Sequence, residues 1–138
     1  MSIINEVSSC NIDEYGNKHW RLPNGDLHRE NNLPAVERTD GTKKWFINGK
    51  LHRENDLPAI EYADGDKCWY VNGLHHRVNG PAYEYADGCK YWHLEGVRYS
   101  EEEYNEKVKD YKVETIPTQE NNSYSQGYKD DNTGLKWL

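Results

Sequence analysis

The sequence lacks the features that mark membrane and secreted proteins. No segment approaches the roughly 20 consecutive apolar residues that a membrane-spanning helix needs, and the chain does not begin with a basic stretch followed by an apolar run. The three cysteines, Cys10, Cys68 and Cys89, are an odd number without paired spacing, which fits a reducing compartment better than a disulfide framework. We therefore expect a soluble, cytoplasmic protein that has no membrane partner.

An excess of charge of either sign is missing from the middle of the chain. The net charge is -7, but residues 15–99 carry 12 acidic and 12 basic side chains, so the excess of acid lies at the two ends. Proteins that bind phosphate backbones normally show a basic stripe, and none is present here. Aliphatic residues are few, so five Trp and eleven Tyr must supply most of the buried apolar area. The composition predicts one small β-rich domain without a nucleic-acid partner.

Sequence patterns of catalysis are absent as well. There is no glycine-rich phosphate loop, no HExxH pair and no isolated pair of acidic residues. His28, His52 and His76 recur at intervals of 24, so they belong to different copies of a unit instead of converging as metal ligands would. We interpret them as packed or hydrogen-bonded structural histidines, and we predict no catalytic residue, no metal and no cofactor. An enzyme with a site at the histidine-rich edge stays open as an alternative.

A repeated unit of about 24 residues organises the chain. The His-Arg and Pro-Ala pairs recur at nearly constant spacing, together with Trp20, Trp45, Trp69 and Trp92. Asp-Gly and Asn-Gly punctuate short segments of alternating polarity, and these dipeptides are the strongest signals for two-residue hairpin turns. The pattern predicts a mainly β fold, in which about four units of three strands each form an elongated antiparallel β-meander of hairpin repeats.

Two-residue turns would also fix which residues face each other across the strands. In the unit around Trp69, the Asp-Gly turn should pair Ile60 with Trp69. The Asn-Gly turn of the same unit should pair Tyr70 with His75. In this register each recurring Arg lies in one row with the recurring Glu that precedes it, and inter-strand ion pairs are expected there.

The same register gives the sheet two unlike faces. The first, which we name the Trp face, is uniform because each Trp is flanked two positions away by Lys and by an aliphatic residue. The second, the variable face, would carry Cys68 and the recurring glutamates at ordinary surface positions. A cation over a ring is expected where Tyr62 faces Lys67. We predict that the Trp face packs and that the variable face binds a partner through His19, Arg21, Lys44, Phe46, Tyr70, Tyr91 and His93.

The repeats end in a predicted helix. Residues Ser100–Glu103 form a capping box, and a narrow apolar stripe from Tyr104 to Tyr111 would lay the helix against the last repeat. The polar segment that follows ends in Trp137 and Leu138, which we expect to dock on the protein or on a partner. The predicted organisation is an N-terminal cap over 1–14, the repeat array over 15–99, the capping helix over 100–112 and the tail over 113–138.

The segment LPAIEYADGDKCWYVNGLHHRVNGPA contains the pattern PAxExxxDGxKxWxxNGxxHRxxGPA. This pattern resembles the β-hairpin repeats grouped with MORN repeats in tailed phages, large DNA viruses and some bacteria. The closing GVRYSEEEY resembles the strand and helix that often end such arrays. The resemblance covers about residues 15–112 and implies a MORN-like repeat fold. It also implies a non-enzymatic module for protein association, because no catalytic residue set accompanies these repeats.

These features together favour a non-catalytic protein-binding repeat protein. The resemblance is consistent with a phage or viral accessory protein. For such an origin we expect the partner to be a host enzyme or host defence protein, which the chain binds and inhibits in the host cytoplasm. An alternative is a structural protein whose copies assemble into homo-oligomers through sheet edges or through the C-terminal tail.

Overall fold

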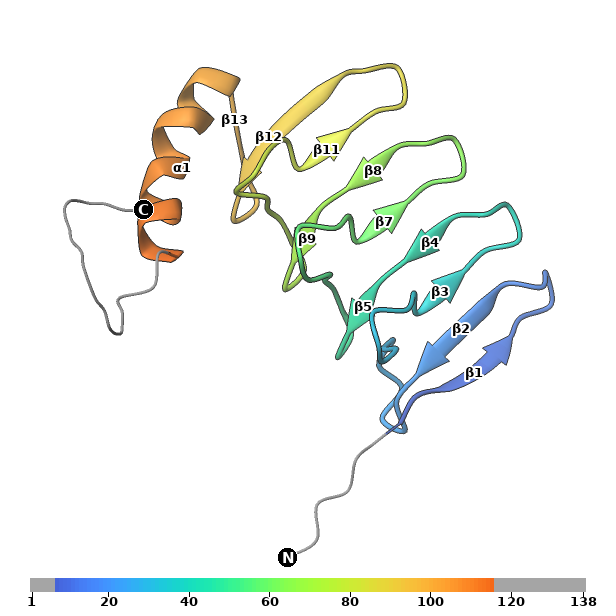
Figure 1. The fold of residues 1–138 in the computed structure, drawn as a ribbon. Helices are drawn as coiled ribbons and strands as arrows, with labels where there is room; N and C mark the ends of the chain where they lie inside the picture. Colours follow the sequence, from blue (N-terminus) through green and yellow to red (C-terminus); the bar gives the residue numbers. More distant parts are fainter. Residues whose placement is uncertain (1–6, 116–138) are drawn as a thin grey trace, which may run out of the picture. The chain divides into compact units, whose positions relative to one another are not determined.

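A computed structural model describes residues 7–115 of the chain (Figure 1). The fold is mainly β, a meander of antiparallel strands followed by a single helix, as the repeat pattern predicts. The elements are β1 (Ser9–Ile12), β2 (Lys18–Arg21), β3 (Val36–Glu37), β4 (Lys43–Lys44), β5 (Phe46–Ile47), β6 (Lys50–Leu51), β7 (Ile60–Glu61), β8 (Lys67–Cys68), β9 (Tyr70–Val71), β10 (Leu74–His75), β11 (Tyr83–Glu84), β12 (Lys90–Leu94), β13 (Val97–Tyr99) and α1 (Glu101–Thr115).

Nine of these strands form one antiparallel sheet. Their order is β1-β2-β3-β4-β7-β8-β11-β12-β13, so strands that are neighbours in the sheet follow one another along the chain apart from two excursions. The excursions are the separate two-stranded hairpins β5-β6 and β9-β10, which follow β4 and β8 (Figure 1). A repeat unit thus combines a long hairpin in the large sheet with a short hairpin beside it.

The short hairpins turn as the sequence predicts. Asn72-Gly73 has positive φ at both residues, 51° and 85°, as a type I′ turn requires. Asn48-Gly49 has the same conformation, and Glu95-Gly96 adopts it at 50° and 86° although glutamate rarely takes a positive φ. Tyr70 lies opposite His75 in the resulting register, which confirms the expected pairing.

The long hairpins turn differently, and the expected register across Asp-Gly is wrong by one residue. Gly65 has a φ of 102°, while Asp64 is not among the residues with positive φ. Gly65 N–H bonds the carbonyl of Tyr62, and Tyr62 N–H bonds the carbonyl of Asp66, so the loop holds three residues. This is a type I turn closed by a glycine bulge. The Asp64 carboxylate stabilises it by accepting the N–H of Asp66 at 3.0 Å.

The corrected register exchanges residues between the faces. Ile60 lies opposite Cys68 instead of Trp69, and Glu61 lies opposite Lys67. Tyr62 therefore does not face Lys67, and the expected cation over that ring is not formed. One row of the large sheet, on the Trp face, now alternates in charge: Lys18, Glu37, Lys43, Glu61, Lys67, Glu84 and Lys90. The adjacent row, on the variable face, contains His19, Val36, Lys44, Ile60, Cys68, Tyr83 and Tyr91.

Both faces contribute to the core. Trp45 and Trp69 are each 6% exposed on the Trp face, while Ile60 on the variable face is 4% exposed. Cys68 is 1% exposed, so its predicted surface position is wrong. The expectation that packing is confined to the Trp face is also wrong, because the register shift moves the aliphatic residues that follow Pro-Ala onto the other side of the sheet.

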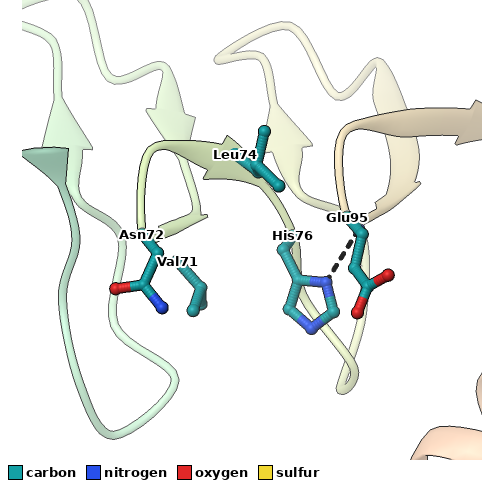
Figure 2. Close-up of a pocket in the computed structure, with 5 residues that line it drawn as sticks. All are labelled: Val71, Asn72, Leu74, His76 and Glu95. Atoms are coloured by element: carbon teal, nitrogen blue, oxygen red, sulfur yellow. Dashed lines mark hydrogen bonds between the residues drawn. The ribbon is translucent and has the colours of Figure 1, made fainter.

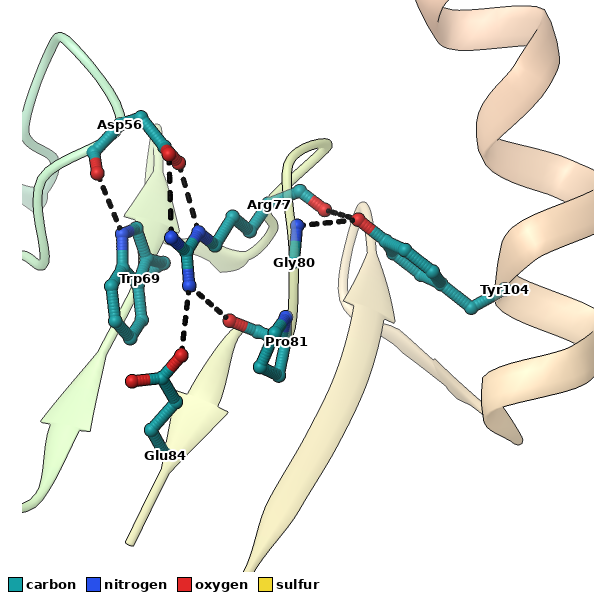
Figure 3. A network of polar contacts seen from close by, with 7 residues as sticks. All are labelled: Asp56, Trp69, Arg77, Gly80, Pro81, Glu84 and Tyr104. Carbon is teal, nitrogen blue, oxygen red and sulfur yellow. Dashed lines mark hydrogen bonds and ion pairs between the residues drawn. The ribbon is translucent and has the colours of Figure 1, made fainter. Parts of the chain in front are cut away.

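A recurring polar network covers the Trp face. In the third unit, Arg77 bonds Glu84 at 3.2 Å and the carbonyl of Pro81 at 3.1 Å, and its Nε reaches Asp56 of the preceding unit at 2.9 Å (Figure 3). The Trp69 indole N–H bonds the carbonyl of Asp56 at 3.0 Å. The expected Arg–Glu ion pairs form, but with the glutamate that follows each arginine instead of the one before it. Guanidinium groups lie 3.6 to 3.9 Å from the Trp ring centroids in the pairs Arg29–Trp20, Arg53–Trp45 and Arg77–Trp69.

The recurring histidines connect each unit to the next. In each of them, Nδ1 accepts a backbone N–H from the short turn of the following unit. This contact confirms that they are hydrogen-bonded structural residues. The pairs are His28 with Asn48 at 3.0 Å, His52 with Asn72 at 3.0 Å and His76 with Glu95 at 2.9 Å.

The array ends at an aromatic side chain that replaces an arginine. Tyr104, in the first turn of α1, accepts the N–H of Gly80 at 3.2 Å and donates to the carbonyl of Arg77 (Figure 3). Its ring centroid lies 6.4 Å from that of Trp92. In the fourth unit Ser100 occupies the position of the recurring arginine, so Tyr104 covers the last Trp in its place.

Helix α1 begins at the predicted capping box. Glu103 N–H bonds the Ser100 hydroxyl, and Ser100 N–H bonds the Glu103 carboxylate, each at 3.1 Å.

The chain divides after Tyr104 into two compact parts, the second of which begins at Asn105. Within residues 7–115, no helix is long and apolar enough to cross a membrane. The predicted docking residues, Trp137 and Leu138, lie outside the described part of the chain.

Candidate binding surface

Aromatic side chains gather on the variable face of the third and fourth units. The ring of His75 is central, with its centroid 4.2 Å from that of Tyr70, 4.7 Å from His93 and 5.9 Å from Tyr83. These side chains come from β9, β10, β11 and β12, so a short hairpin meets the long hairpin of the next unit. We use the name aromatic cluster for Tyr70, His75, Tyr83, Tyr85, Tyr91 and His93.

Tyrosine rings extend the cluster along the long hairpin β11-β12. Tyr83 and Tyr85 stack with centroids 4.4 Å apart, and Tyr91 meets them edge-on at 6.5 Å and 5.7 Å. Tyr85 is 37% exposed, and the other members of the cluster are half-buried. Aromatic pairs in such geometries contribute about 0.5–1.5 kcal/mol beyond the area they bury. These contacts hold the rings in place in a surface of aromatic rings and hydroxyl groups.

The histidines of the cluster lack hydrogen-bond partners on one ring nitrogen each. His75 Nε2 and His93 Nδ1 are buried and bond nothing within the described residues. Burial lowers the pKa of His75, and the neighbouring His93 lowers it further. Burial, followed by the charge of Arg98, lowers the pKa of His93. Both rings are therefore neutral at pH 7, and burial also raises the pKa of Tyr83.

Arg98 borders the cluster on β13. It lies opposite His93, and its guanidinium group is 4.0 Å from the centroid of Tyr91. The side chain is exposed, and within residues 7–115 it pairs with no carboxylate. The arginines of the Trp face differ, since each of those bonds a glutamate and a proline carbonyl.

The structure brings together three of the seven predicted binding residues, Tyr70, Tyr91 and His93. Lys44 and Phe46 belong to the preceding unit, where both are half-buried. Lys44 shares the sheet row of Cys68 and Tyr83, two strands away from Cys68.

The remaining two predicted residues lie in the first unit and are engaged locally. His19 Nε2 is 3.1 Å from an Asp13 carboxylate oxygen, and Arg21 bonds the carbonyl of Gly25 at 3.0 Å. Desolvation alone would raise the pKa of Asp13, but hydrogen bonds from Asn17, His19 and backbone amides lower it to about 2. His19 and Arg21 thus take part in closing the first hairpins.

Sequence reasoning missed His75, Tyr83, Tyr85 and Arg98. His75 could have been found, because the predicted Asn-Gly register already places it opposite Tyr70. A two-residue Asp-Gly loop, applied to the fourth unit, would place Tyr83 and Tyr85 on the Trp face, whereas the observed pairing of Tyr83 with Tyr91 places them on the variable face.

A separate pocket of about 300 Å³ lies beside the short hairpin β9-β10 (Figure 2). Val71, Asn72, Leu74, His76 and Glu95 line it. His76 accepts the backbone N–H of Glu95, which is the same inter-unit bond that His28 and His52 make in the other units. Within residues 7–115, no three His, Cys, Asp or Glu side chains are grouped so that they could hold a metal ion. The pocket therefore offers fewer distinctive groups than the aromatic cluster.

Comparisons with protein-family models, with curated proteins and with solved structures found no match for this chain. The fold and the surface define an antiparallel β-hairpin repeat protein with a localised aromatic cluster. Function must therefore be argued from that surface.

Proposed function

We propose that this chain is a non-catalytic repeat protein that binds a protein partner through the aromatic cluster. The observation that carries the proposal is the continuous contact of six rings, one of them substantially exposed. They lie at positions that differ between the units, since Tyr91 corresponds to Lys44 and Cys68. Tyrosine and arginine are enriched at the residues that dominate the binding energy of protein interfaces. Tyr85, Tyr91 and Arg98 supply both types within one patch.

The groups that could have served catalysis have other partners. The recurring His, Arg and Glu side chains bond backbone groups or one another in successive units. Burial raises the pKa of Cys68 to about 11, so its thiol is a poor nucleophile at neutral pH. Both observations support a binding role for the repeats.

Capture from a lysate tests this role. The immobilised full chain should retain a protein that the Tyr70→Ser, Tyr85→Ser double variant loses. Tyr15→Ser is the matched control, because Tyr15 is 73% exposed in the first unit and lies outside the cluster. Equal thermal melting of the three proteins would show that folding is retained. The proposal fails if no partner is captured, or if the double variant captures it as well as the control does.

Inhibition of a host defence protein by a phage or virus is a narrower form of the same proposal. It is motivated by the sequence resemblance and stays a prediction. Addition of the purified chain to an activity assay of the captured partner is the test, and unchanged partner activity at saturation would contradict it.

Self-assembly is a second candidate function, favoured by the first strand of the sheet. All four residues of β1 are exposed at the sheet edge, and the sequence Ser-Cys-Asn-Ile has none of the charges or prolines that commonly protect edges. A second copy could pair there through backbone hydrogen bonds. Light scattering of the wild type and of Cys10→Pro, a residue whose N–H points away from β2, should then show a concentration-dependent oligomer that the variant loses, whereas a monomer at every concentration would reject this candidate.

A further inference from the structure

Arg98 is the one charged group in contact with the aromatic cluster whose donors are unused within the described residues. Its guanidinium carbon lies over the Tyr91 ring, 4.0 Å from the ring centroid, and its side chain is exposed. Stacking of this kind orders the side chain before a ligand arrives and leaves the planar edge of the guanidinium group open. That edge matches a carboxylate, which accepts two parallel N–H bonds from it.

The surroundings favour a negatively charged ligand. Glu61 and Glu84, which recur in the units that form the cluster, lie on the opposite face and bond Arg53 and Arg77 there. Asp66, which follows a long turn, uses a carboxylate oxygen to accept a backbone N–H of the next unit at 2.7 Å. The neutral histidines add no charge of their own, so Arg98 is the charge in direct contact with the rings of the cluster within residues 7–115.

From this geometry we infer that the partner presents an acidic side chain next to an aromatic or aliphatic one. Its carboxylate binds the guanidinium group of Arg98, and its apolar neighbour packs against Tyr85 and Tyr91. The inference rests on the proposed function, because it specifies the chemistry of the protein segment that the cluster receives. An acidic partner is complementary to Arg98, which pairs with no carboxylate within residues 7–115.

Selection from random peptides tests the inference without knowledge of the partner. Dodecapeptides displayed on filamentous phage are selected on the immobilised full chain, and the enriched sequences are synthesised with amidated C-termini so that only side chains supply carboxylates. We expect Asp or Glu beside Phe, Trp, Leu or Ile. Arg98→Gln should weaken the binding of these peptides at least tenfold, whereas Arg38→Gln, which removes the same charge at another exposed site, should leave it unchanged.

A double-mutant cycle makes the contact specific. Replacing the peptide's acid by its amide should weaken binding to the wild type, but should have little further effect on Arg98→Gln, because the same contact is already lost. Peptides that lose binding to Tyr85→Ser but carry no acid, or that bind Arg98→Gln normally, would overturn this inference and leave the proposed function standing. If no selected peptide depends on Tyr85, the proposed binding surface fails together with the inference.

Discussion

The two faces of the sheet use the same strands in opposite ways. On the Trp face, each recurring arginine covers a Trp ring and bonds the glutamate that follows it, and Arg53 also bonds Asn32 of the preceding unit, so the charged groups of one unit are satisfied by its neighbours along the chain. On the variable face, the rings differ between units, and within residues 7–115 three buried ring nitrogens, on His19, His75 and His93, bond nothing and Arg98 pairs with no carboxylate. Contacts that repeat between neighbours stabilise an array of this kind. The face that does not repeat is therefore the one on which substitutions could create a binding site.

The largest expected difference is in the reaction rates of the cysteine thiols, because the register of the strands decides which cysteine is buried. Cys68 should react with a thiol reagent far more slowly than the exposed Cys10 and Cys89. Burial raises its pKa from 9.0 to about 11, which alone reduces the thiolate fraction at neutral pH about a hundredfold. Time courses with a chromogenic disulfide should show two fast thiols and one that reacts on unfolding. Three equally fast thiols would favour the register expected from two-residue Asp-Gly turns.

The register across the Asp-Gly turns marks the limit of what the sequence predicts. Asn-Gly could be assigned because a type I′ turn needs two positive φ angles, which asparagine and glycine tolerate. Asp-Gly is compatible with two loop lengths, and the choice depends on the Asp64 carboxylate bonding the amide two residues later. Because the loop has three residues instead of two, Tyr83 lies opposite Tyr91 and on the same face of the sheet.

The candidate site shows the same limit. Tyr70 and Tyr91 could be placed on the variable face because alternation along their strands did not depend on the misjudged turn. The contact of His75 with His93 could not be predicted, because it joins the short hairpin of one unit to the next unit. Local periodicity sets pairing within a hairpin, but it does not set how successive hairpins stack.

Removal of an aromatic ring should lower the free energy of unfolding more on the Trp face than on the variable face. Trp69→Ala deletes a side chain that is 6% exposed and also removes the support of Arg77, so the free energy of unfolding should fall by about 3–5 kcal/mol. Tyr85→Ala, at a ring 37% exposed on the variable face, should cost less than half as much. Urea unfolding measures both. Equal losses would mean that the variable face carries as much of the stability as the Trp face.

Arginines on the two faces offer a finer comparison. Arg53→Ala removes bonds to Glu61 and to the carbonyl of Pro58 and uncovers Trp45, which should lower the free energy of unfolding by about 1–3 kcal/mol. Arg98→Ala loses a ring contact at an exposed site and should stay within about 1 kcal/mol of the wild type. Urea unfolding of the two variants is the measurement. A larger loss for Arg98→Ala would give that residue a structural role and weaken its assignment to ligand binding.

The smallest expected effect is a pH dependence that originates on the variable face. Burial lowers the pKa of His75 and His93 below the 6.5 of an unperturbed histidine, so near and below pH 6.5 the unfolded chain binds more protons than the folded one. The free energy of unfolding should therefore be fully developed above about pH 7 and decrease as the pH is lowered through 6.5. Carboxylates with lowered pKa values, such as those of Asp13 and Glu30, affect stability at lower pH, outside this window.

Replacing both cluster histidines by phenylalanine should flatten this profile between pH 7.5 and pH 5.5. A smaller slope should remain, because burial lowers the pKa of His76 as well. Urea unfolding at the two pH values, for the wild type and for the His75→Phe, His93→Phe double variant, supplies the comparison. A wild type that is equally stable or more stable at pH 5.5 would mean that charging these rings is not opposed by their surroundings, and the contrast between a satisfied Trp face and an unsatisfied variable face would be lost.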